Sequence, residues 1–354
     1  MKNKTTLSPY LAAGILATVL YIVFAAKPLE EEFQFVPEWK IDVANPTVIN
    51  DNSTDEKTHR FKLGQTMGYF TDSGKITNFI TFPFKATISD DFYAFYTSNS
   101  TGCDLFSRNG TKIGRIDQPG FPMLADERIF VFLPGGNSLA SVDQNGNLLW
   151  EFESPSPITA FDSSKSGCAL GFADGGVVQF DSEGKIIQRF SPGGSELQVI
   201  LGAAISSDGK LIATVSGQNK ERFVLSKRED AHSRIIFHEF SKNSMPYQKL
   251  VKFSKDASKV FYDFDGSLGI VDTQTCKSKH IKIIGQAISL EESDRCVFLL
   301  TKKGDDYRVY IVENNSSLVG SFAFKAKTAF IKADNESLFV GKDTTISKLK
   351  ILSR

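Results

Sequence analysis

Paired carboxylates are the side chains of this sequence best suited to acid–base chemistry. They occur at Asp90-Asp91, at Asp263 with Asp265, and at Asp305-Asp306. Two carboxylates held close together can act as general acid and general base. Each pair lies in a short polar segment between apolar runs, however, where acidic side chains usually cap turns in water. We therefore assign no catalytic residue.

Metal-binding and cofactor-binding motifs are the next candidates. The spacing of the histidines and cysteines matches none of the usual metal-binding motifs. The histidines show neither H-x-H nor H-E-x-x-H, and the cysteines show no C-x-x-C. Asp143-x-Asn145-Gly146 is similar to the start of a calcium loop, but a hairpin turn accounts for it. We expect no metal and no cofactor, while disulfides and free buried thiols both remain open. The residues concerned are His59, His232, His238, His280, Cys103, Cys168, Cys276 and Cys296.

Composition limits the partners. The chain has 354 residues with 41 Lys and Arg against 41 Asp and Glu, so its net charge is zero. A nucleic-acid-binding protein normally carries a basic stripe, and we expect no nucleic-acid partner. The 30 Phe and 27 Gly, against 4 Met and 2 Trp, favour many short strands joined by glycine turns.

The N-terminus predicts a membrane anchor. No charge occurs from residue 5 to residue 26, and a stretch of this length can span the roughly 30 Å hydrocarbon core. We expect a cytoplasmic segment at residues 1–8 and a transmembrane signal-anchor helix at residues 9–27. Lys2 and Lys4 precede this span, which places the rest of the chain outside the cytoplasm. A cleaved signal peptide, leaving a secreted or periplasmic protein, is the alternative.

Residues 28–58 read as an acidic, irregular tether between the anchor and the folded domain. Phe33, Phe35, Val36 and Trp39 are exceptions within it, because exposed aromatic side chains in a linker are costly. We expect them to pack on the domain or at the lipid interface. A short docking motif for another protein is the alternative.

An internal repeat decides the fold class. A hairpin turn with a central glycine recurs at Gly74, Gly110, Gly146 and Gly184, at intervals of 36, 36 and 38 residues. A second polar turn recurs between these, as in Ser206–Leu211. Each period thus holds four short strands, which is one blade of a β-propeller.

Two tracts resemble known propeller repeats. Leu139–Ala160 resembles the PQQ-like repeat, and the turn from Ser206 to Ala213 is similar to those of WD-repeat and YVTN-type propellers. The resemblance implies an all-β propeller domain over residues 59–354. Trp150, the aromatic residue of the repeat, is expected to be buried between neighbouring blades.

The number of blades depends on how the ring closes. Six complete four-strand sets are expected to begin near Thr87, Phe121, Ile158, Val199, Leu250 and Ala287. Residues 328–352 supply three further strands, and residues 75–82 can supply a fourth, which favours seven blades. Eight blades are the alternative if residues 61–71 belong to a separate blade.

The function expected is binding rather than catalysis. The Trp-rich repeat, calcium ligands and vicinal cysteines typical of quinoprotein dehydrogenases are missing from the sequence. Within the resemblance, the nearest functional analogue is the propeller lipoprotein of outer-membrane β-barrel assembly, although this chain has no lipidation cysteine. We expect a protein–protein interaction scaffold on the outer side of a bacterial inner membrane, with envelope or membrane proteins as partners. The alternatives are a propeller enzyme of lactonase, glycosidase or lyase type and a glycan or small-ligand sensor.

Overall fold

The computed structural model describes residues 8–24, 33–49, 56–125, 128–194, 196–230, 232–242, 247–314 and 316–353. In this part of the chain the secondary structure is one helix, α1 (Pro9–Phe24), and 31 strands. The strands form eight antiparallel sheets, which we number as blades 1 to 8. The domain is therefore all-β, as predicted.

The first four blades follow one another along the chain. Their strands are β2 (Thr58–Leu63), β3 (Thr66–Thr71) and β4 (Ile76–Thr81) in blade 1; β5 (Lys85–Ile88), β6 (Phe92–Tyr96), β7 (Cys103–Ser107) and β8 (Lys112–Ile116) in blade 2; β9 (Phe121–Ala125), β10 (Arg128–Phe132), β11 (Ser138–Val142) and β12 (Leu148–Glu153) in blade 3; β13 (Ile158–Ser164), β14 (Gly167–Phe172), β15 (Val177–Asp181) and β16 (Ile186–Phe190) in blade 4.

The last four blades continue this order, except that blade 8 also takes a strand from the N-terminal region. Their strands are β17 (Ile200–Ile205), β18 (Leu211–Ser216), β19 (Arg222–Glu229) and β20 (His232–Phe240) in blade 5; β21 (Val251–Phe253), β22 (Lys259–Phe264), β23 (Ser267–Asp272) and β24 (Ser278–Lys282) in blade 6; β25 (Gln286–Glu292), β26 (Cys296–Lys303), β27 (Asp306–Glu313) and β28 (Leu318–Lys325) in blade 7; β29 (Ala329–Asp334), β30 (Ser337–Lys342), β31 (Thr345–Ser353) and β1 (Phe33–Asp42) in blade 8.

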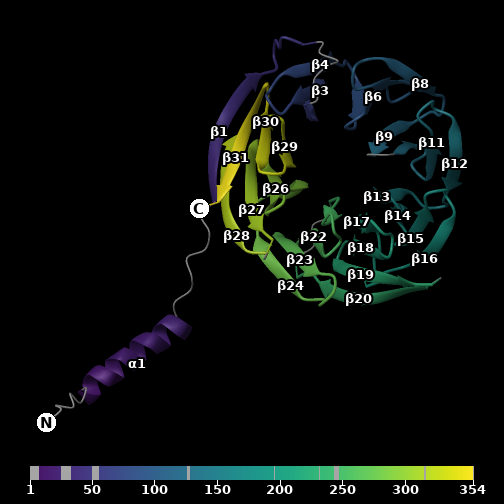
Figure 1. The fold of residues 1–354 in the computed structure, drawn as a ribbon. Coiled ribbons are helices and arrows are strands. Elements are labelled where there is room, and N and C mark those ends of the chain that lie inside the picture. The colour runs from purple at the N-terminus through teal and green to yellow at the C-terminus, as the bar shows by residue number, and fades with distance from the viewer. Residues whose placement is uncertain are drawn as a thin grey trace.

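The blades stand in a ring around a central channel (Figure 1). The first strand of a complete blade, such as β9, β13 or β17, lies toward the channel, and the fourth, such as β12, β16 or β20, lies at the outside. Apolar clusters fill the spaces between neighbouring blades, with Phe130 and Leu139 of blade 3 packing against Leu170 and Phe180 of blade 4. All six predicted four-strand sets are confirmed as blades 2 to 7.

The predicted glycine turns connect the third and fourth strands. Gly74, Gly110, Gly146 and Gly184 have φ values of 85°, 89°, 90° and 83°, in the left-handed region that favours glycine. Asp143 shows how the turn is held: its Oδ1 accepts hydrogen bonds from the backbone N–H groups of Asn145 and Asn147, both at 2.8 Å. This segment is therefore a hairpin turn, as the sequence suggested.

The ring has eight blades, so the prediction of seven was wrong and its alternative is confirmed. Strand β4, which was expected to complete the last blade, instead pairs with β3 in blade 1. The outer place in blade 8 is taken by β1, which pairs with β31 over Phe33–Asp42. The residues 61–71 accordingly belong to a blade of their own, formed by β2, β3 and β4.

Residues 33–42 are part of the propeller, which corrects the tether predicted over residues 28–58 and moves the start of the domain from residue 59 to residue 33. The register between β1 and β31 shifts between Pro37 and Trp39. Proline lacks a backbone N–H and is tolerated in an edge strand at such a bulge. The proline and the bulge interrupt the alternation of side chains, so the segment looked irregular in the sequence.

The aromatic side chains of β1 pack on the domain, which was one of the places predicted for them. The ring of Phe35 contacts Phe298 edge-on at 6.3 Å between centroids. The ring centroid of Trp39 lies 6.1 Å from that of Phe70 and 5.9 Å from that of Phe339. The Trp39 indole N–H also donates to the carbonyl of Asp72 at 3.0 Å. Trp39 thereby joins blade 8 to blade 1.

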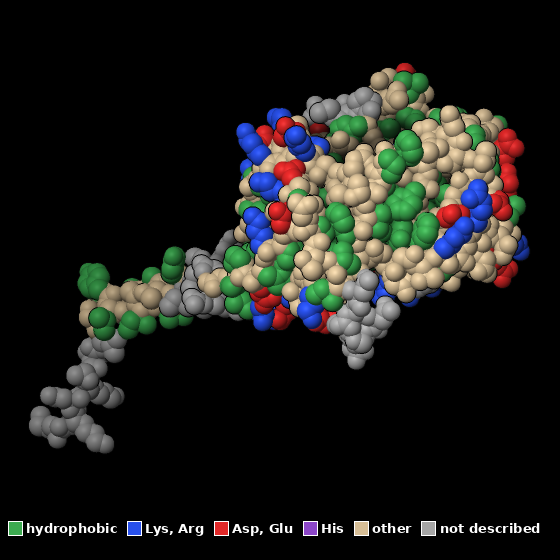
Figure 2. Space-filling view, turned by 90° about the horizontal axis from the view of Figure 1, so that it is seen from above, with side chains coloured by type: hydrophobic (Ala, Val, Ile, Leu, Met, Phe, Trp, Pro, Cys, Tyr) green, Lys and Arg blue, Asp and Glu red, His purple; other side chains and the backbone are tan. Residues whose placement is uncertain are grey.

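Helix α1 covers Pro9–Phe24 of the anchor helix expected at residues 9–27, and residues 25–27 lie outside the described part of the chain. It has 16 residues and lies apart from the ring in both views (Figures 1 and 2). Residues 1–7 of the expected cytoplasmic segment and residues 25–32 are outside the described residues. Within the described ranges, no helix reaches the length and apolar character that a membrane crossing requires.

Trp150 lies between blades 3 and 4, as predicted, but it is half-buried rather than fully buried. Its ring stacks on Phe180 at 5.5 Å between centroids, with 12° between the planes. The turn glycine Gly184 lies against the same ring, and a Cβ there would come within 2.3 Å of it. The repeat glycine therefore serves packing between blades as well as turn geometry.

We predict that removing the Trp39 side chain weakens ring closure. Trp39→Ala should lower the free energy of unfolding by about 3 kcal/mol, as for other large aromatic deletions in cores. Lys40→Ala, at the exposed neighbouring position on β1, should change it by less than about 0.5 kcal/mol. Chemical denaturation of both variants measures the difference, and equal losses would contradict the closing role of β1.

We also predict that Gly184 tolerates alanine far worse than Gly136 does. Both have positive φ, 83° and 75°, so backbone strain is similar in the two variants. A Cβ at Gly184 would meet the Trp150 ring, whereas one at Gly136 has nothing within 4 Å. Melting temperatures should show the larger fall for Gly184→Ala. Similar falls in the two variants would mean that the Trp150 contact is unimportant.

Candidate functional site

Blade 1 differs from the other blades in its inner part. Its sheet has three strands within the described residues, and the turn between β3 and β4 carries the repeat glycine Gly74. In blades 2, 3 and 4 this glycine lies between the third and fourth strands. Strands β2, β3 and β4 therefore correspond to the second, third and fourth strands of a complete blade. The innermost position of blade 1 is not occupied by a described strand.

A cavity of about 550 Å³ lies at one end of the channel beside β2. Blades 1, 2, 6, 7 and 8 contribute to its wall. The lining residues are Glu56, Lys57, Thr58, His59, Arg60, Asp90, Asp91, Arg108, Lys252, Phe253, Lys255, Glu291, Glu292, Lys332, Ala333 and Asp334. Both signs of charge are present, so the cavity suits a polar occupant with charges of its own.

Ion pairs between blades organise the cavity wall. Asp90 of blade 2 accepts from Arg60 of blade 1 at 3.1 Å and faces the Lys332 ammonium of blade 8 at 3.9 Å. Lys332 also lies 3.8 Å from Glu291 of blade 7. Because these side chains are partly exposed, each pair contributes little stability on its own. Their effect is to fix the positions of charges around the opening.

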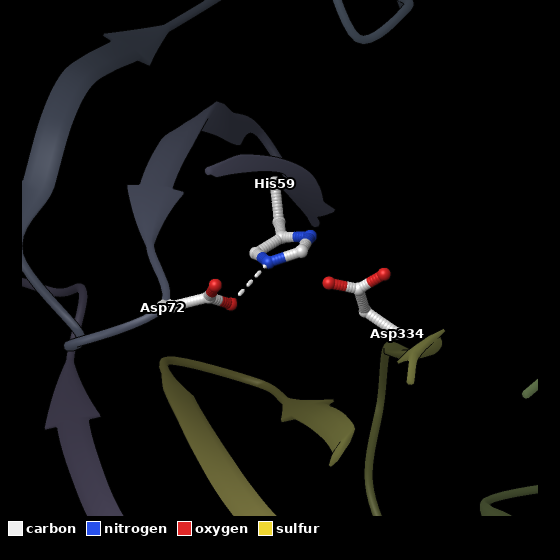
Figure 3. Close-up of side chains that lie close together, drawn as sticks. All are labelled: His59, Asp72 and Asp334. Carbon is white, nitrogen blue, oxygen red and sulfur yellow. Dashed lines mark hydrogen bonds and ion pairs between the residues drawn. The ribbon is translucent and has the colours of Figure 1, made fainter. Parts of the chain in front are cut away.

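Three ligand-type side chains meet at the edge of this cavity (Figure 3). His59 Nε2 lies 2.7 Å from Asp72 Oδ1, and Asp334 points toward the same ring from blade 8. One ligand atom from each residue lies within 4.8 Å of the other two. The Lys57 ammonium pairs with Asp334 Oδ1 at 2.5 Å. The group therefore joins β2, the β3–β4 turn and the end of β29.

Aromatic packing fixes His59 in this group. The side chain is 1% exposed, and its ring centroid lies 5.4 Å from that of Phe70 and 4.5 Å from that of Phe339. Strand β2 alternates buried and half-buried residues, with His59, Phe61 and Leu63 on the buried side. His59 thus occupies a core position of β2 but has its Nε2 atom at the polar edge.

Acidic side chains of one blade accept hydrogen bonds from the backbone of the innermost strand of the following blade. Asp162 Oδ2 accepts from the N–H of Ile205 at 2.9 Å. Asp263 Oδ2 accepts from the N–H of Ala287 at 3.2 Å. These bonds matter because the channel-side edge of an innermost strand has no neighbouring strand to pair with.

A buried charged group joins blades 5 and 6 close to Asp263. Lys249 Nζ lies 3.3 Å from Glu221 Oε2, with both side chains almost fully buried. The Tyr247 hydroxyl donates to Asp263 Oδ2 at 3.1 Å. Burial raises the pKa of the Asp263 carboxyl. Such a group holds neighbouring strands together, and removing one charge would leave the other buried without compensation.

The end of the ring opposite the cavity exposes apolar side chains. In blade 2, strand β5 runs from this end to the cavity-lining Asp90; in blade 7, β25 runs from it to Glu291. Exposed apolar residues lie at or just before the beginnings of innermost strands in blades 2, 3, 5 and 7. We call this set the apolar rim: Phe84, Phe121, Met123, Leu197, Ile284 and Ile288.

The three acid pairs singled out in the sequence lie in different surroundings. Asp90 takes part in the ion pairs at the cavity, and Asp91 also lines it. Asp263 is buried and bonds the backbone, while its neighbour Asp265 lies in the β22–β23 turn. Asp305 and Asp306 are both exposed.

The other candidate residues are scattered. His232 and His238 lie on β20, and His280 Nε2 lies 3.1 Å from Glu239 across blades 5 and 6. That hydrogen bond raises the pKa of His280. The four cysteines are free thiols: Cys103, Cys168 and Cys296 are buried, and Cys276 is half-buried. Burial raises the pKa of Cys103 to about 11, so this thiol is unreactive near neutral pH.

Sequence reasoning missed the group formed by His59, Asp72 and Asp334. Asp72 and Asp334 each stood in a recurring turn, where an acidic residue has an ordinary capping role. Ring closure was expected to bring residues 75–82 to residues 328–352, but nothing in the sequence indicated that Asp72 and Asp334 would both lie against His59. Only the pairing of blades 1 and 8 reveals it.

We predict that Asp162 gives stability an unusual pH dependence. Burial raises its pKa from 3.8 to about 6, so the folded state holds a proton that the unfolded state has lost between about pH 4 and pH 6. Stability from this group is present below pH 4 and is lost as the pH rises through 6. Asp162→Asn should remove that loss and gain about 1–3 kcal/mol at pH 7, because an amide oxygen still accepts from Ile205.

Asp143 provides a control of opposite sign for this experiment. Hydrogen bonds from Asn147 and Asn145 lower its pKa, so its contribution is lost as the pH falls. Urea denaturation between pH 3 and pH 7 should show Asp143→Asn losing stability at neutral pH, where Asp162→Asn gains it. Parallel curves for Asp162→Asn and the unmodified protein would refute the prediction.

Two comparisons place this fold among known proteins. A Treponema pallidum (strain Nichols) protein described as uncharacterized is 27% identical over 361 residues, covering 99% of this chain and 96% of that protein. The crystal structure of BamB from Moraxella catarrhalis is similar with a TM-score of 0.61, at 12% identity, over 90% of this chain and all of that one. The second likeness concerns the fold, and it confirms the PQQ-like propeller resemblance seen in Leu139–Ala160.

A family model described as "beta-propeller protein" matches residues 1–353, which is almost the whole chain. The match includes the helix and β1 as well as the ring. The chain belongs to this beta-propeller protein family.

Proposed function

We propose that this protein is a membrane-anchored, extracytoplasmic scaffold that binds other proteins of the cell envelope through the apolar rim. The observation that carries the proposal is the exposure of large apolar side chains at one end of a rigid ring, with Phe84 at 64% and Ile284 at 55%. Exposed apolar side chains that act together as one patch mark a surface that partners cover, and we take the apolar rim as such a surface. We assign no catalytic role.

The aromatic part of the rim resembles a binding hot spot in its composition. Phe121 makes an edge-on contact with Tyr96 at 6.0 Å between centroids, and the Lys85 ammonium lies 4.9 Å from the centre of the Phe121 ring. Tyr is among the residue types enriched in binding hot spots, and Tyr96 supplies one beside Phe121. A partner segment with apolar side chains and an acidic group would suit this surface.

The position of β1 supports an orientation for the scaffold. Phe33 pairs with Ser353, and the nearby Ile351 N–H donates to the carbonyl of Glu336 in the β29–β30 turn. The chain therefore enters the ring at the end that carries the cavity. With the N-terminal apolar segment as an inner-membrane anchor, the cavity end would face the membrane and the apolar rim would face away from it.

The charge pattern of the N-terminus supports this location. Lys2 and Lys4 precede the apolar segment, and Glu30, Glu31 and Glu32 follow it. This asymmetry favours a cytoplasmic N-terminus and a ring on the outer side of the membrane. A role in envelope assembly is the finer part of the proposal, and it rests on the propeller resemblance alone.

An enzyme or a sensor of small ligands is the second candidate. Its support is the convergence of His59, Asp72 and Asp334 at the edge of a polar cavity of about 550 Å³. Propeller enzymes and sensors place their ligands in such openings. The two candidates use opposite ends of the ring, so they can be tested separately.

The scaffold proposal predicts site-specific cross-linking from the apolar rim. A photoreactive phenylalanine analogue at position 84 or 284 should cross-link a defined envelope protein in intact cells. Leu149 gives a matched control, since it is 61% exposed but lies on β12 at the outside of blade 3. Adducts of the same strength at position 149 would contradict the proposed surface.

The partner found in this way should then be tested with purified proteins. The double variant Phe84→Ser with Ile284→Ser should bind at least tenfold more weakly than the unmodified protein, because two apolar anchors are lost. Leu149→Ser should bind normally. Unchanged affinity of the double variant would overturn the proposal.

A further inference from the structure

We propose that His59, Asp72 and Asp334 form a binding site for one divalent transition-metal ion, with Zn²⁺ as the ion of choice. The site would join blade 1 to blade 8. The inference is independent of the scaffold proposal, which concerns the other end of the ring.

The geometry of the three side chains suits a metal ion. One ligand atom from each residue lies within 4.8 Å of the other two. An ion about 2.0–2.2 Å from each ligand atom would replace the direct hydrogen bond of 2.7 Å between His59 Nε2 and Asp72 Oδ1. An imidazole nitrogen with two carboxylate oxygens is a ligand set that zinc accepts. Magnesium and calcium prefer oxygen ligands alone.

The imidazole is held ready to coordinate. Phe70 and Phe339 fix the His59 ring on the buried side of β2, while Nε2 bonds Asp72 and Asp334 points toward the ring (Figure 3). The Trp39 indole N–H bonds the carbonyl of Asp72 and so fixes the turn that carries the second ligand. Fixed orientation of this kind is typical of metal ligands, whose supporting contacts reduce the cost of ordering them.

The cavity provides access and space for water ligands. His59 and Asp334 both line it. Asp72 is 41% exposed in its side chain, and Asp334 is 15% exposed. An ion can therefore enter from solvent and keep water at its remaining positions, as an open zinc site does.

Lys57 is the natural competitor of the ion. Its ammonium bonds Asp334 Oδ1 at 2.5 Å, yet its side chain is 59% exposed. A long, exposed side chain can turn into solvent when a doubly charged ion takes its place. A purely structural ion pair would lose stability without Lys57, whereas a metal site would lose a competitor and bind its ion more tightly.

Zinc titration of the purified full-length chain in detergent tests the proposal. Isothermal titration calorimetry should show one site for the unmodified protein, and zinc should raise the melting temperature because it binds only the folded state. His59→Gln and Asp334→Asn should each weaken binding at least tenfold. Lys57→Ala should tighten it several-fold.

Two controls separate this site from unspecific zinc binding. His280→Gln removes a histidine that also pairs with a carboxylate, Glu239, at 3.1 Å, and it should leave zinc affinity unchanged. Asp72→Asn tests the more exposed carboxylate in case His59→Gln fails to fold, and it too should weaken binding. Equal zinc affinity in Asp72→Asn, Asp334→Asn and the unmodified protein would overturn the proposal. Weaker binding by Lys57→Ala, or Mg²⁺ binding as tight as Zn²⁺ binding, would also overturn it.

Discussion

Closure of the ring by β1 and β31 is the contact on which the rest of this structure depends. Any sheet ends in strands with unpaired backbone groups, which invite association with other chains. Here the strand from the N-terminal region lies against the last strand of the chain over Phe33–Asp42. Because blade 8 is completed in this way, blade 1 is free to pack against it, and the turn carrying Asp72 meets the end of β29, which carries Asp334. The candidate metal site is thus a product of closure.

Backbone N–H groups on the channel-facing edge of the ring are bonded in a different way, by buried acidic side chains. Asp162 and Asp263 accept hydrogen bonds from the innermost strand of the following blade, at Ile205 and Ala287. Burial raises the pKa of both carboxyls, which means that the folded state pays for holding them charged at neutral pH. Asp162 bonds Ile205 at the cavity end of β17, whereas Asp263 bonds Ala287 at the beginning of β25, so buried carboxyls serve innermost strands at both ends of the ring.

The recurring glycine turns made the blades predictable from the sequence. The pairing of β1 and the contacts of His59 join distant segments and could not be predicted in this way. The turn at Gly184 is recognisable from its own short segment of sequence, so its glycine was enough to place β15 and β16. The number of blades depended on where β1 pairs, and the bulge between Pro37 and Trp39 hid that strand. The His59 group could not be predicted for the same reason, because residues 59 and 334 meet only after the ring has closed.

The two ends of the ring offer different chemistry, and the contact between blades 1 and 8, which we call the seam, carries the His59 group at only one of them. The cavity end carries fixed charges, the chain's entry at Phe33 and the His59 group, while the apolar rim belongs to blades 2, 3, 5 and 7. A metal ion at the seam would add no contact to the rim. It could influence a partner there only by stabilising the ring as a whole. An ion that binds the folded protein equally well with and without the partner does not change the affinity for that partner. Metal binding and partner binding would therefore be coupled only if partner binding changed the contact between blades 1 and 8.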